Sequence, residues 1–124
     1  METKATITAI GAAALAPNDP LVILFDDSAT PALREVTLIQ QFEDLEAQRA
    51  MTLATGDTLV IGATPFTITA VGQLANPSLQ SIGHVALVFT APPAEDRLEN
   101  ALYLKPTTRP HFEVGTTLTY QTNA

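Results

Sequence analysis

The second half of this 124-residue sequence repeats the first half. The repeat consists of four short segments that occur in the same order in both halves, separated by 59 to 65 positions. They pair Thr6–Gly11 with Thr67–Gly72, Leu21–Phe25 with Val85–Phe89, Val36–Gln40 with Ala101–Lys105, and Gly56–Val60 with Gly115–Thr119. Because four ordered matches are hard to obtain by chance, we expect two halves of the same topology.

Each repeated segment is predicted to be a β-strand. The segments are rich in Thr, Val and Ile, are about five residues long and are bounded by Gly, Pro, Asn or Asp. Two four-stranded halves would bury their apolar faces against each other. The prediction is an all-β fold, a small barrel or two-sheet sandwich of about eight strands with an internal pseudo-two-fold repeat, formed by residues 1–124 as one domain. The expected core is Ile7, Ile23, Leu38, Leu59, Ile68, Leu87, Leu102 and Leu118.

One short helix is predicted over residues 76–83. Asn76 is expected to cap it, Pro77 suits its first position, and Gly83 can adopt the left-handed conformation that ends a helix. Residues 43–51 contain helix-forming side chains but no evident cap, so their structure stays open. The proline-rich and charged stretch 91–101 is predicted to be an exposed connection.

Composition excludes several classes of protein. The chain has no cysteine, which excludes disulfides, thiol catalysis and Cys-ligated zinc. Its formal net charge of −7 disfavours binding to nucleic acid or to an anionic membrane surface. The longest apolar runs are far too short to cross a bilayer, and the first residues do not resemble a signal peptide. We therefore expect a soluble, cytoplasmic domain that is not itself a membrane protein.

Two histidines are the candidates for chemistry. His84 follows Gly83 and opens a predicted strand, which would place it at a sheet rim where reactive side chains are common. The structural alternative, which the sequence favours, is a histidine that caps helix carbonyls or packs at the strand end. His111 lies next to Pro110 among polar residues and is predicted to be an exposed loop histidine.

Other reactive constellations are not evident. The acidic pairs of the chain are adjacent in sequence, which favours solvated turns over a converging acid–base pair. The glycines do not have the spacing of a phosphate-binding loop, and no serine lies in a nucleophile motif. Neither histidine has the spacing of a metal ligand relative to another such group. We predict no cofactor and no metal.

The second half of the chain resembles a known family. The segments Thr69–Gly72 and Leu79–Phe89, with Gly83-His84-Val85 as the most specific junction, are similar to the glucitol/sorbitol-specific enzyme IIA components of the bacterial sugar phosphotransferase system. The segment Thr6–Gly11 and the total length agree with this, so the resemblance covers essentially the whole chain.

The resemblance implies a cytoplasmic phosphocarrier with an all-β fold. Such proteins take a phosphoryl group from the small histidine-containing carrier protein onto a histidine and pass it to the IIB portion of a membrane sugar transporter, whose IIC portion carries the sugar. A neutral imidazole is nucleophilic near neutral pH and can hold the group as a transferable phosphoramidate. The implied partners are proteins, and the number of identical chains in an assembly stays open.

One segment departs from the family pattern. The family's phosphorylated histidine lies in an Ile-His-x-His stretch, and the matching segment here is Leu38–Leu45. Gln40 therefore occupies the phosphoacceptor position and Phe42 the position of the second histidine. A carboxamide nitrogen is not a useful nucleophile, so we expect little phosphate uptake at Gln40 and cannot assign the chain as an enzyme on this basis.

Three hypotheses follow for the function. In the first, the chain is a sorbitol-type IIA phosphocarrier and His84, or a shifted alignment, provides the acceptor. In the second, it is a degenerate IIA homologue that acts as a non-phosphorylated binding or regulatory protein. In the third, the barrel binds an unrelated small molecule. We also predict that Gln40 and His84 lie close together at one rim of the fold.

Overall fold

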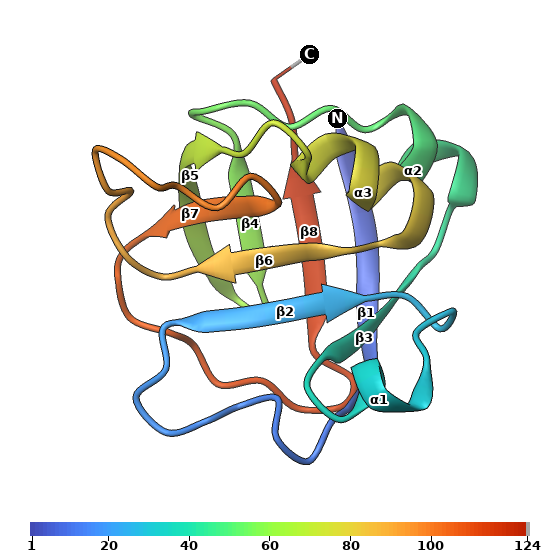
Figure 1. Ribbon diagram of the computed structural model, residues 1–124. Coiled ribbons are helices and arrows are strands. Elements are labelled where there is room, and N and C mark those ends of the chain that lie inside the picture. Colours follow the sequence, from blue (N-terminus) through green and yellow to red (C-terminus); the bar gives the residue numbers. More distant parts are fainter. Residues whose placement is uncertain (124) are drawn as a thin grey trace.

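The barrel is built from eight strands, all within residues 1–123, which are the residues that the computed structural model describes. The strands are β1 (Glu2–Ile10), β2 (Leu21–Phe25), β3 (Leu38–Phe42), β4 (Thr58–Ile61), β5 (Thr64–Val71), β6 (Val85–Val88), β7 (Ala101–Lys105) and β8 (Thr117–Gln121). They close a barrel in the order β1-β3-β2-β6-β7-β5-β4-β8 (Figure 1). The all-β prediction is confirmed, and the architecture is a barrel.

The two halves of the repeat have the same pattern of strand pairing, as an internal two-fold symmetry requires. β1 pairs with β3 antiparallel as β5 pairs with β7, and β2 lies parallel to β3 as β6 lies parallel to β7. β1 and β5 each carry a register shift at the same place, between Ile7 and Ala9 and between Ile68 and Ala70. The halves meet at four strand pairings: β2 with β6, β4 with β8, β4 with β5 and β1 with β8.

A glycine follows β1 and another follows β5. Each is required because the backbone there passes very close to a neighbouring loop. The Gly11 amide donates to the Thr37 carbonyl at 3.0 Å, and the Gly72 amide donates to the Ala101 carbonyl at 2.8 Å. A Cβ on either glycine would overlap a backbone carbonyl of the neighbouring loop, that of Arg34 or that of Glu99. The repeated Gly in the two sequence segments therefore reports a backbone crossing that no larger residue permits.

Two of the four repeat alignments were wrong by one residue. Ile7 faces Gln40 across β1 and β3, and its counterpart Ile68 faces Leu104, so Gln40 corresponds to Leu104 and not to Lys105. In the parallel pairs, Leu38 lies beside Leu24 and Leu102 lies beside Leu87. Leu24 of β2 is therefore equivalent to Leu87 of β6, so the separation between equivalent residues of these two strands is one position smaller than the sequence match indicates.

This shift explains the one error in the predicted core. Ile23 is half-buried and lies on the outer face of β2, because one step of register moves a strand residue to the opposite face. The buried neighbours on β2 are Val22 and Leu24, each with no exposed surface. The other predicted core residues are confirmed as fully buried members of the central cluster: Ile7, Leu38, Leu59, Ile68, Leu87, Leu102 and Leu118.

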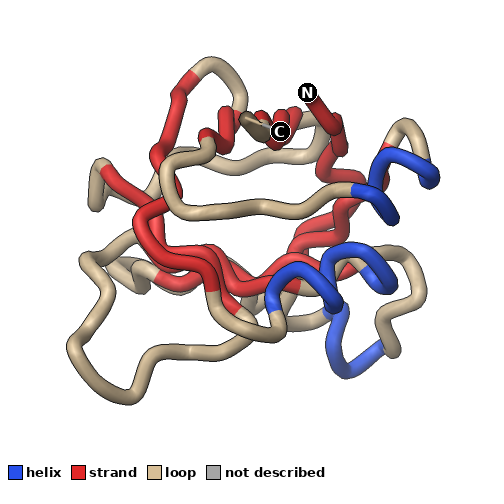
Figure 2. The backbone as a smooth tube through the Cα atoms, turned by 90° about the horizontal axis from the view of Figure 1, so that it is seen from above, coloured by secondary structure: helices blue, strands red, loops and turns tan. Residues whose placement is uncertain are grey.

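Three short helices lie on one side of the barrel (Figure 2). The predicted helix is present as α3 (Ala75–Ile82), and Gly83 ends it with a left-handed φ of 61°. The expected cap at Asn76 is wrong, because the helix begins one residue earlier and Asn76 makes two hydrogen bonds to the backbone of Leu53, at 2.8 and 2.9 Å. This amide anchors the segment before β4 to the helix.

The other two helices were not predicted. α2 (Leu45–Ala50) is capped by Asp44, whose carboxylate accepts from the amides of Glu46 and Ala47. α1 (Pro31–Arg34) has proline at its first position, after Thr30. The exposed connection expected over residues 91–101 is present but ends at residue 100, because Ala101 is buried and begins β7. Within residues 1–123, no helix has the length and apolar character needed to cross a membrane.

Candidate functional site

Gln40 is a fully buried polar side chain inside the end of the barrel. Leu38, Gln40 and Phe42 alternate along β3 and face the interior, while Gln41 faces solvent. The Gln40 Nε2 donates to the Gly83 carbonyl at 2.9 Å, and the Tyr120 hydroxyl donates to Gln40 Oε1 at 2.7 Å. Both ends of the buried carboxamide are thus satisfied, which removes the free-energy penalty of burying it.

The orientation of this amide is fixed by its neighbours. The Gly83 carbonyl can only accept a hydrogen bond, so it selects the NH2 end of Gln40. Burial raises the pKa of Tyr120, which keeps its hydroxyl protonated and able to donate to Oε1. The three groups form a directed chain of hydrogen bonds from β8 through β3 to the junction between α3 and β6.

The cavity next to Gln40 is acidic. It has a volume of about 370 Å³, and Asp26, Asp27 and Glu43 line it. Phe42, which the resemblance predicts to replace a second histidine, is buried, and its ring stacks on Tyr120 with centroids 5.7 Å apart. A phosphoryl group at this place would face three carboxylates without a cation among the lining residues.

His84 packs at the start of β6 in a half-buried position. Its ring lies 4.7 Å from the ring of Phe25, measured between centroids, and its Nδ1 lies 3.2 Å from the side-chain nitrogen of Asn100. Burial lowers the pKa of His84, so the neutral imidazole is favoured at pH 7. The hydrogen bond to Asn100 engages Nδ1, so Nε2 is the ring nitrogen without a protein hydrogen bond in the described part of the chain.

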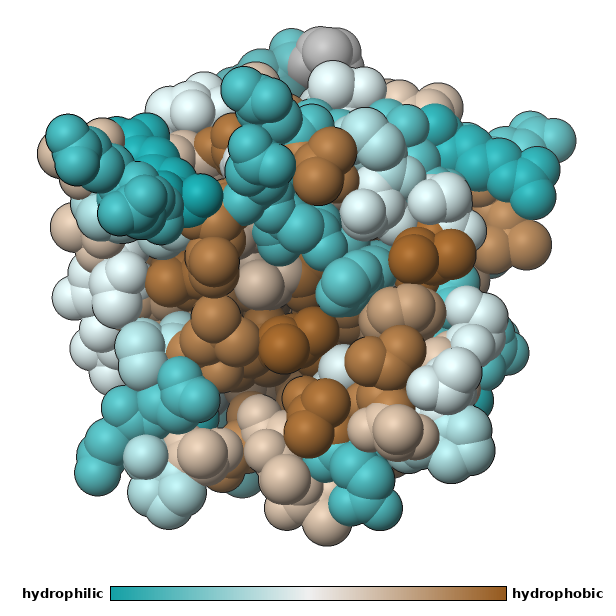
Figure 3. All heavy atoms as spheres, in the orientation of Figure 1, coloured by the Kyte–Doolittle hydropathy of each residue, from teal (hydrophilic) through white to brown (hydrophobic). Residues whose placement is uncertain are grey.

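The backbone joins Gln40 and His84 while their side chains line different cavities. Gln40 bonds to the peptide carbonyl immediately before His84. The His84 ring instead lines a groove on the outside of the barrel, with the apolar side chains Leu21, Ile23, Ala86 and Leu98. Figure 3 shows the apolar surface over β2 and β6 in this region. A role for either residue stays a prediction.

His111 lies apart from both. Its side chain is 82% exposed, and its Nε2 is 3.4 Å from a carboxylate oxygen of Glu113 in the same loop. This agrees with the exposed loop histidine expected from the sequence. Among residues 1–123, no three His, Asp or Glu side chains gather in a way that could hold a metal ion.

The sequence analysis missed the partners of Gln40. Tyr120 is 80 residues away in the chain and was not singled out. Gln48 is a second buried amide of this region, and its Nε2 donates to the Leu79 carbonyl of α3 at 2.8 Å. The only signal in the sequence was a glutamine at an inward position of an apolar strand, which requires a buried partner without identifying it.

The fold and the site define a class of protein: a closed barrel of two interlocked repeats, with a polar strand-end position next to a helix–strand junction. The family model for the PTS system glucitol/sorbitol-specific IIA component matches residues 2–119. This chain belongs to that family.

Individual relatives agree. The PTS system glucitol/sorbitol-specific EIIA component of Escherichia coli (strain K12) is 34% identical over 87 residues, which cover 69% of this chain and 68% of the relative. The corresponding component of Shigella flexneri gives the same identity and coverage. The crystal structure of a PTS system IIA component from Enterococcus faecalis V583 superposes with a TM-score of 0.90 at 40% identity, covering 96% of this chain and 99% of that one.

Proposed function

We propose that this chain is a IIA component that binds its phosphotransferase partners without carrying phosphate at position 40. The observation that supports this most directly is the buried Gln40 carboxamide, whose oxygen and nitrogen are both committed to hydrogen bonds. The proposal takes position 40 as the family acceptor by resemblance. The partners would be the histidine-containing carrier protein and the IIB and IIC parts of a sugar transporter.

The chemistry of the relay explains why this residue type matters. In the relay that the resemblance implies, an imidazole nitrogen of the acceptor attacks phosphorus as the bond from phosphorus to the carrier's histidine nitrogen breaks. The acceptor needs a free lone pair for that step. The amide nitrogen of Gln40 has its lone pair delocalised into the carbonyl group, and its N–H is donated to Gly83.

The acidic residues around the Gln40 cavity favour binding to a basic protein surface. Asp26, Asp27 and Glu43 surround the cavity, and the chain as a whole has a net charge of −7. These charges would repel a phosphoryl group and attract a partner with lysines and arginines around its own reactive position. Loss of phosphate transfer is therefore compatible with retained docking.

Phosphorylation tests the proposal. We expect the intact mass of the wild-type chain to stay unchanged after incubation with phosphoenolpyruvate, enzyme I and the carrier protein, while the carrier in the same mixture gains one phosphoryl group. In Gln40→His we expect partial labelling, because an imidazole is restored while the buried Phe42 still crowds the position. Acid-labile phosphorylation of the wild type that disappears in His84→Ala would overturn the proposal and make His84 the carrier.

Docking is tested separately. The wild-type chain should be retained by an immobilised carrier protein or IIB domain, and Asp27→Lys should weaken that retention. Glu95→Lys, the same charge reversal in the exposed connection between β6 and β7, serves as the control. If neither the carrier protein nor the IIB domain retains the chain, the proposed binding role is wrong.

A further inference from the structure

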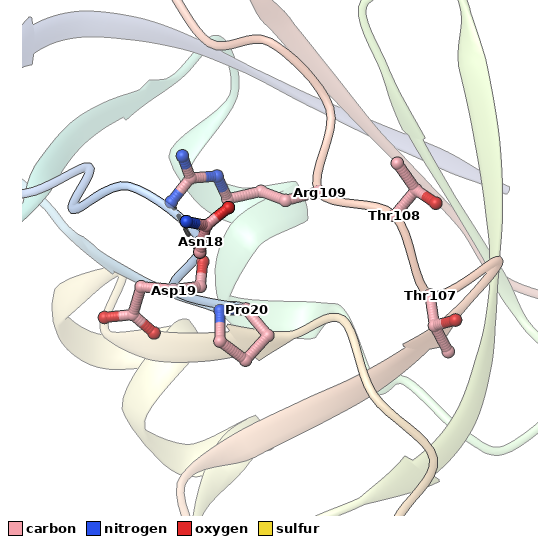
Figure 4. A pocket seen from close by; sticks show the side chains of 6 residues that line it. All are labelled: Asn18, Asp19, Pro20, Thr107, Thr108 and Arg109. Carbon is pink, nitrogen blue, oxygen red and sulfur yellow. Dashed lines mark hydrogen bonds between the residues drawn. The ribbon is translucent and has the colours of Figure 1, made fainter.

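We propose that a cavity at the start of β2 binds a small oxyanion, with Arg109 as its principal ligand. Two loops form the cavity, which has a volume of about 330 Å³ (Figure 4). One loop precedes β2 and the other follows β7. The lining residues are Asn18, Asp19, Pro20, Thr107, Thr108 and Arg109. This proposal is independent of whether position 40 carries phosphate.

The Arg109 guanidinium is held in a fixed orientation. Its Nη1 donates to the carbonyls of Ala16 and Asp19, each at 2.9 Å. Within residues 1–123, Nε and Nη2 of Arg109 make no hydrogen bond to protein. These two nitrogens lie on one edge of the guanidinium and present parallel N–H groups, the geometry that binds a carboxylate or phosphate in a bidentate manner. The bonds to Ala16 and Asp19 therefore orient this edge before any ligand arrives.

Further donors line the same cavity. The hydroxyls of Thr107 and Thr108 and the amide of Asn18 have no protein hydrogen bond in the described part of the chain. The carboxylate of Asp19 accepts from the Leu21 amide at 3.0 Å, and in Figure 4 it points away from both threonines. Apart from Asp19, the polar side chains of the cavity can all donate to an oxyanion.

The charge of this cavity differs from that of the Gln40 cavity. The Gln40 cavity is lined by three carboxylates and, among the described residues, by no cation. The cavity at the start of β2 is lined by one cation, Arg109, and one carboxylate, Asp19. It therefore lacks the excess negative charge of the Gln40 cavity, and its guanidinium can attract a phosphate or carboxylate group.

The overall charge limits what kind of binding can occur here. A chain of net charge −7 repels anions at long range, so affinity has to come from directional bonds at short range. The volume admits a small molecule, such as inorganic phosphate or a short phosphate ester, and the shared chemistry is the oxyanion group. Binding should weaken as the salt concentration rises.

Amide chemical shifts provide the test. We expect titration of the ¹⁵N-labelled chain with inorganic phosphate to give saturable, one-site shifts centred on Asn18, Asp19, Thr107, Thr108 and Arg109. Acetate and glycerol phosphate, titrated in the same way, distinguish a carboxylate from a phosphate ester as the preferred group. Arg109→Gln should weaken binding roughly tenfold or more, because it removes a charge-assisted bidentate pair.

Matched variants separate the site from general charge effects. Arg49→Gln removes one positive charge from α2 and should leave the affinity unchanged. Asp19→Asn keeps an oxygen for the Leu21 amide while removing a negative charge, so it should tighten binding without releasing the loop. Shifts that stay linear with anion concentration, shifts spread over the surface, or equal weakening by Arg49→Gln and Arg109→Gln would overturn the proposal.

Discussion

Gln40 illustrates how a buried polar side chain can link separate elements of a barrel. The two polar atoms of its carboxamide connect β8 to the α3–β6 junction. A buried amide contributes little net stability when it is paired, and costs much more when a partner is removed. Substitutions of its hydrogen-bond partners should therefore lower the stability of the fold most.

Removing the Tyr120 hydroxyl should destabilise the fold. Tyr120→Phe keeps the ring that stacks on Phe42 but leaves the buried Gln40 Oε1 without a donor, at an expected cost of about 1–3 kcal/mol. Chemical denaturation measures this change. Tyr103→Phe is the comparison, because the Tyr103 hydroxyl accepts from the Leu98 amide in a partly exposed setting and its loss should cost less. Equal costs would contradict the proposed importance of the buried chain of bonds.

His84 should make stability depend on pH. Burial lowers its pKa below the ordinary value of 6.5, so the unfolded chain binds a proton at a higher pH than the folded chain does. The stability that neutral His84 permits should therefore be lost as pH falls through 6.5 and below. The free energy of unfolding, measured from pH 7.5 to 5, should fall less in His84→Gln than in the wild type. A parallel pH dependence in the two proteins would contradict this.

At the scale of elements, the register of β2 decides which side chains enter the core. Sequence similarity matches Leu21–Phe25 to Val85–Phe89, but the pairings with β3 and β7 show that Leu24 and Leu87 are the equivalent positions of the two halves. Strand residues alternate between faces, so this single step distinguishes interior from exterior positions on β2.

Two neighbouring substitutions test that register. Val22→Ala removes fully buried methyl groups and should cost about 1.5 kcal/mol or more, whereas Ile23→Ala removes more carbon atoms from a half-exposed side chain and should cost less. The measurement is the denaturant concentration at the midpoint of unfolding, compared between variants whose unfolding free energy depends equally steeply on denaturant. A larger loss in Ile23→Ala would place Ile23 in the core and reverse the assignment.

At the scale of the whole molecule, the two halves interlock and do not form separate units. β2 pairs with β6, β4 pairs with β8, and β1 closes on β8, so every edge of the first half is completed by the second. The termini meet at this closure, where the Met1 amino group donates to the Thr122 carbonyl at 3.1 Å. Unfolding should therefore be a single cooperative transition.

Core truncations in one half should destabilise both halves together. Leu87→Ala and Leu118→Ala each remove a fully buried side chain and should each cost roughly 2–5 kcal/mol. Far-UV circular dichroism and tyrosine fluorescence should report the same shifted midpoint in each variant. Separate transitions from the two probes would indicate that the halves unfold independently, and unchanged midpoints would remove these leucines from the core.

The sequence by itself determined the two-fold topology, the strand content and most of the core. Repeated glycines and alternating apolar residues encode those features locally, because a backbone crossing admits only glycine and a strand has a fixed period of two. The same local information placed the end of α3 at Gly83. The assignment of Gln40 to the family's acceptor position rests on the resemblance and stays a prediction.

Only the tertiary structure decided the register of two of the repeated segments, the cap of α2 and the partners of the polar side chains. Similar apolar runs can be matched one residue out of step without losing similarity, and the hydrogen bonds to neighbouring strands remove that ambiguity. Asn76 bonds to Leu53 and Gln40 bonds to Tyr120 across 23 and 80 residues of sequence. Such contacts depend on how the closed barrel brings distant segments together, which no local pattern specifies.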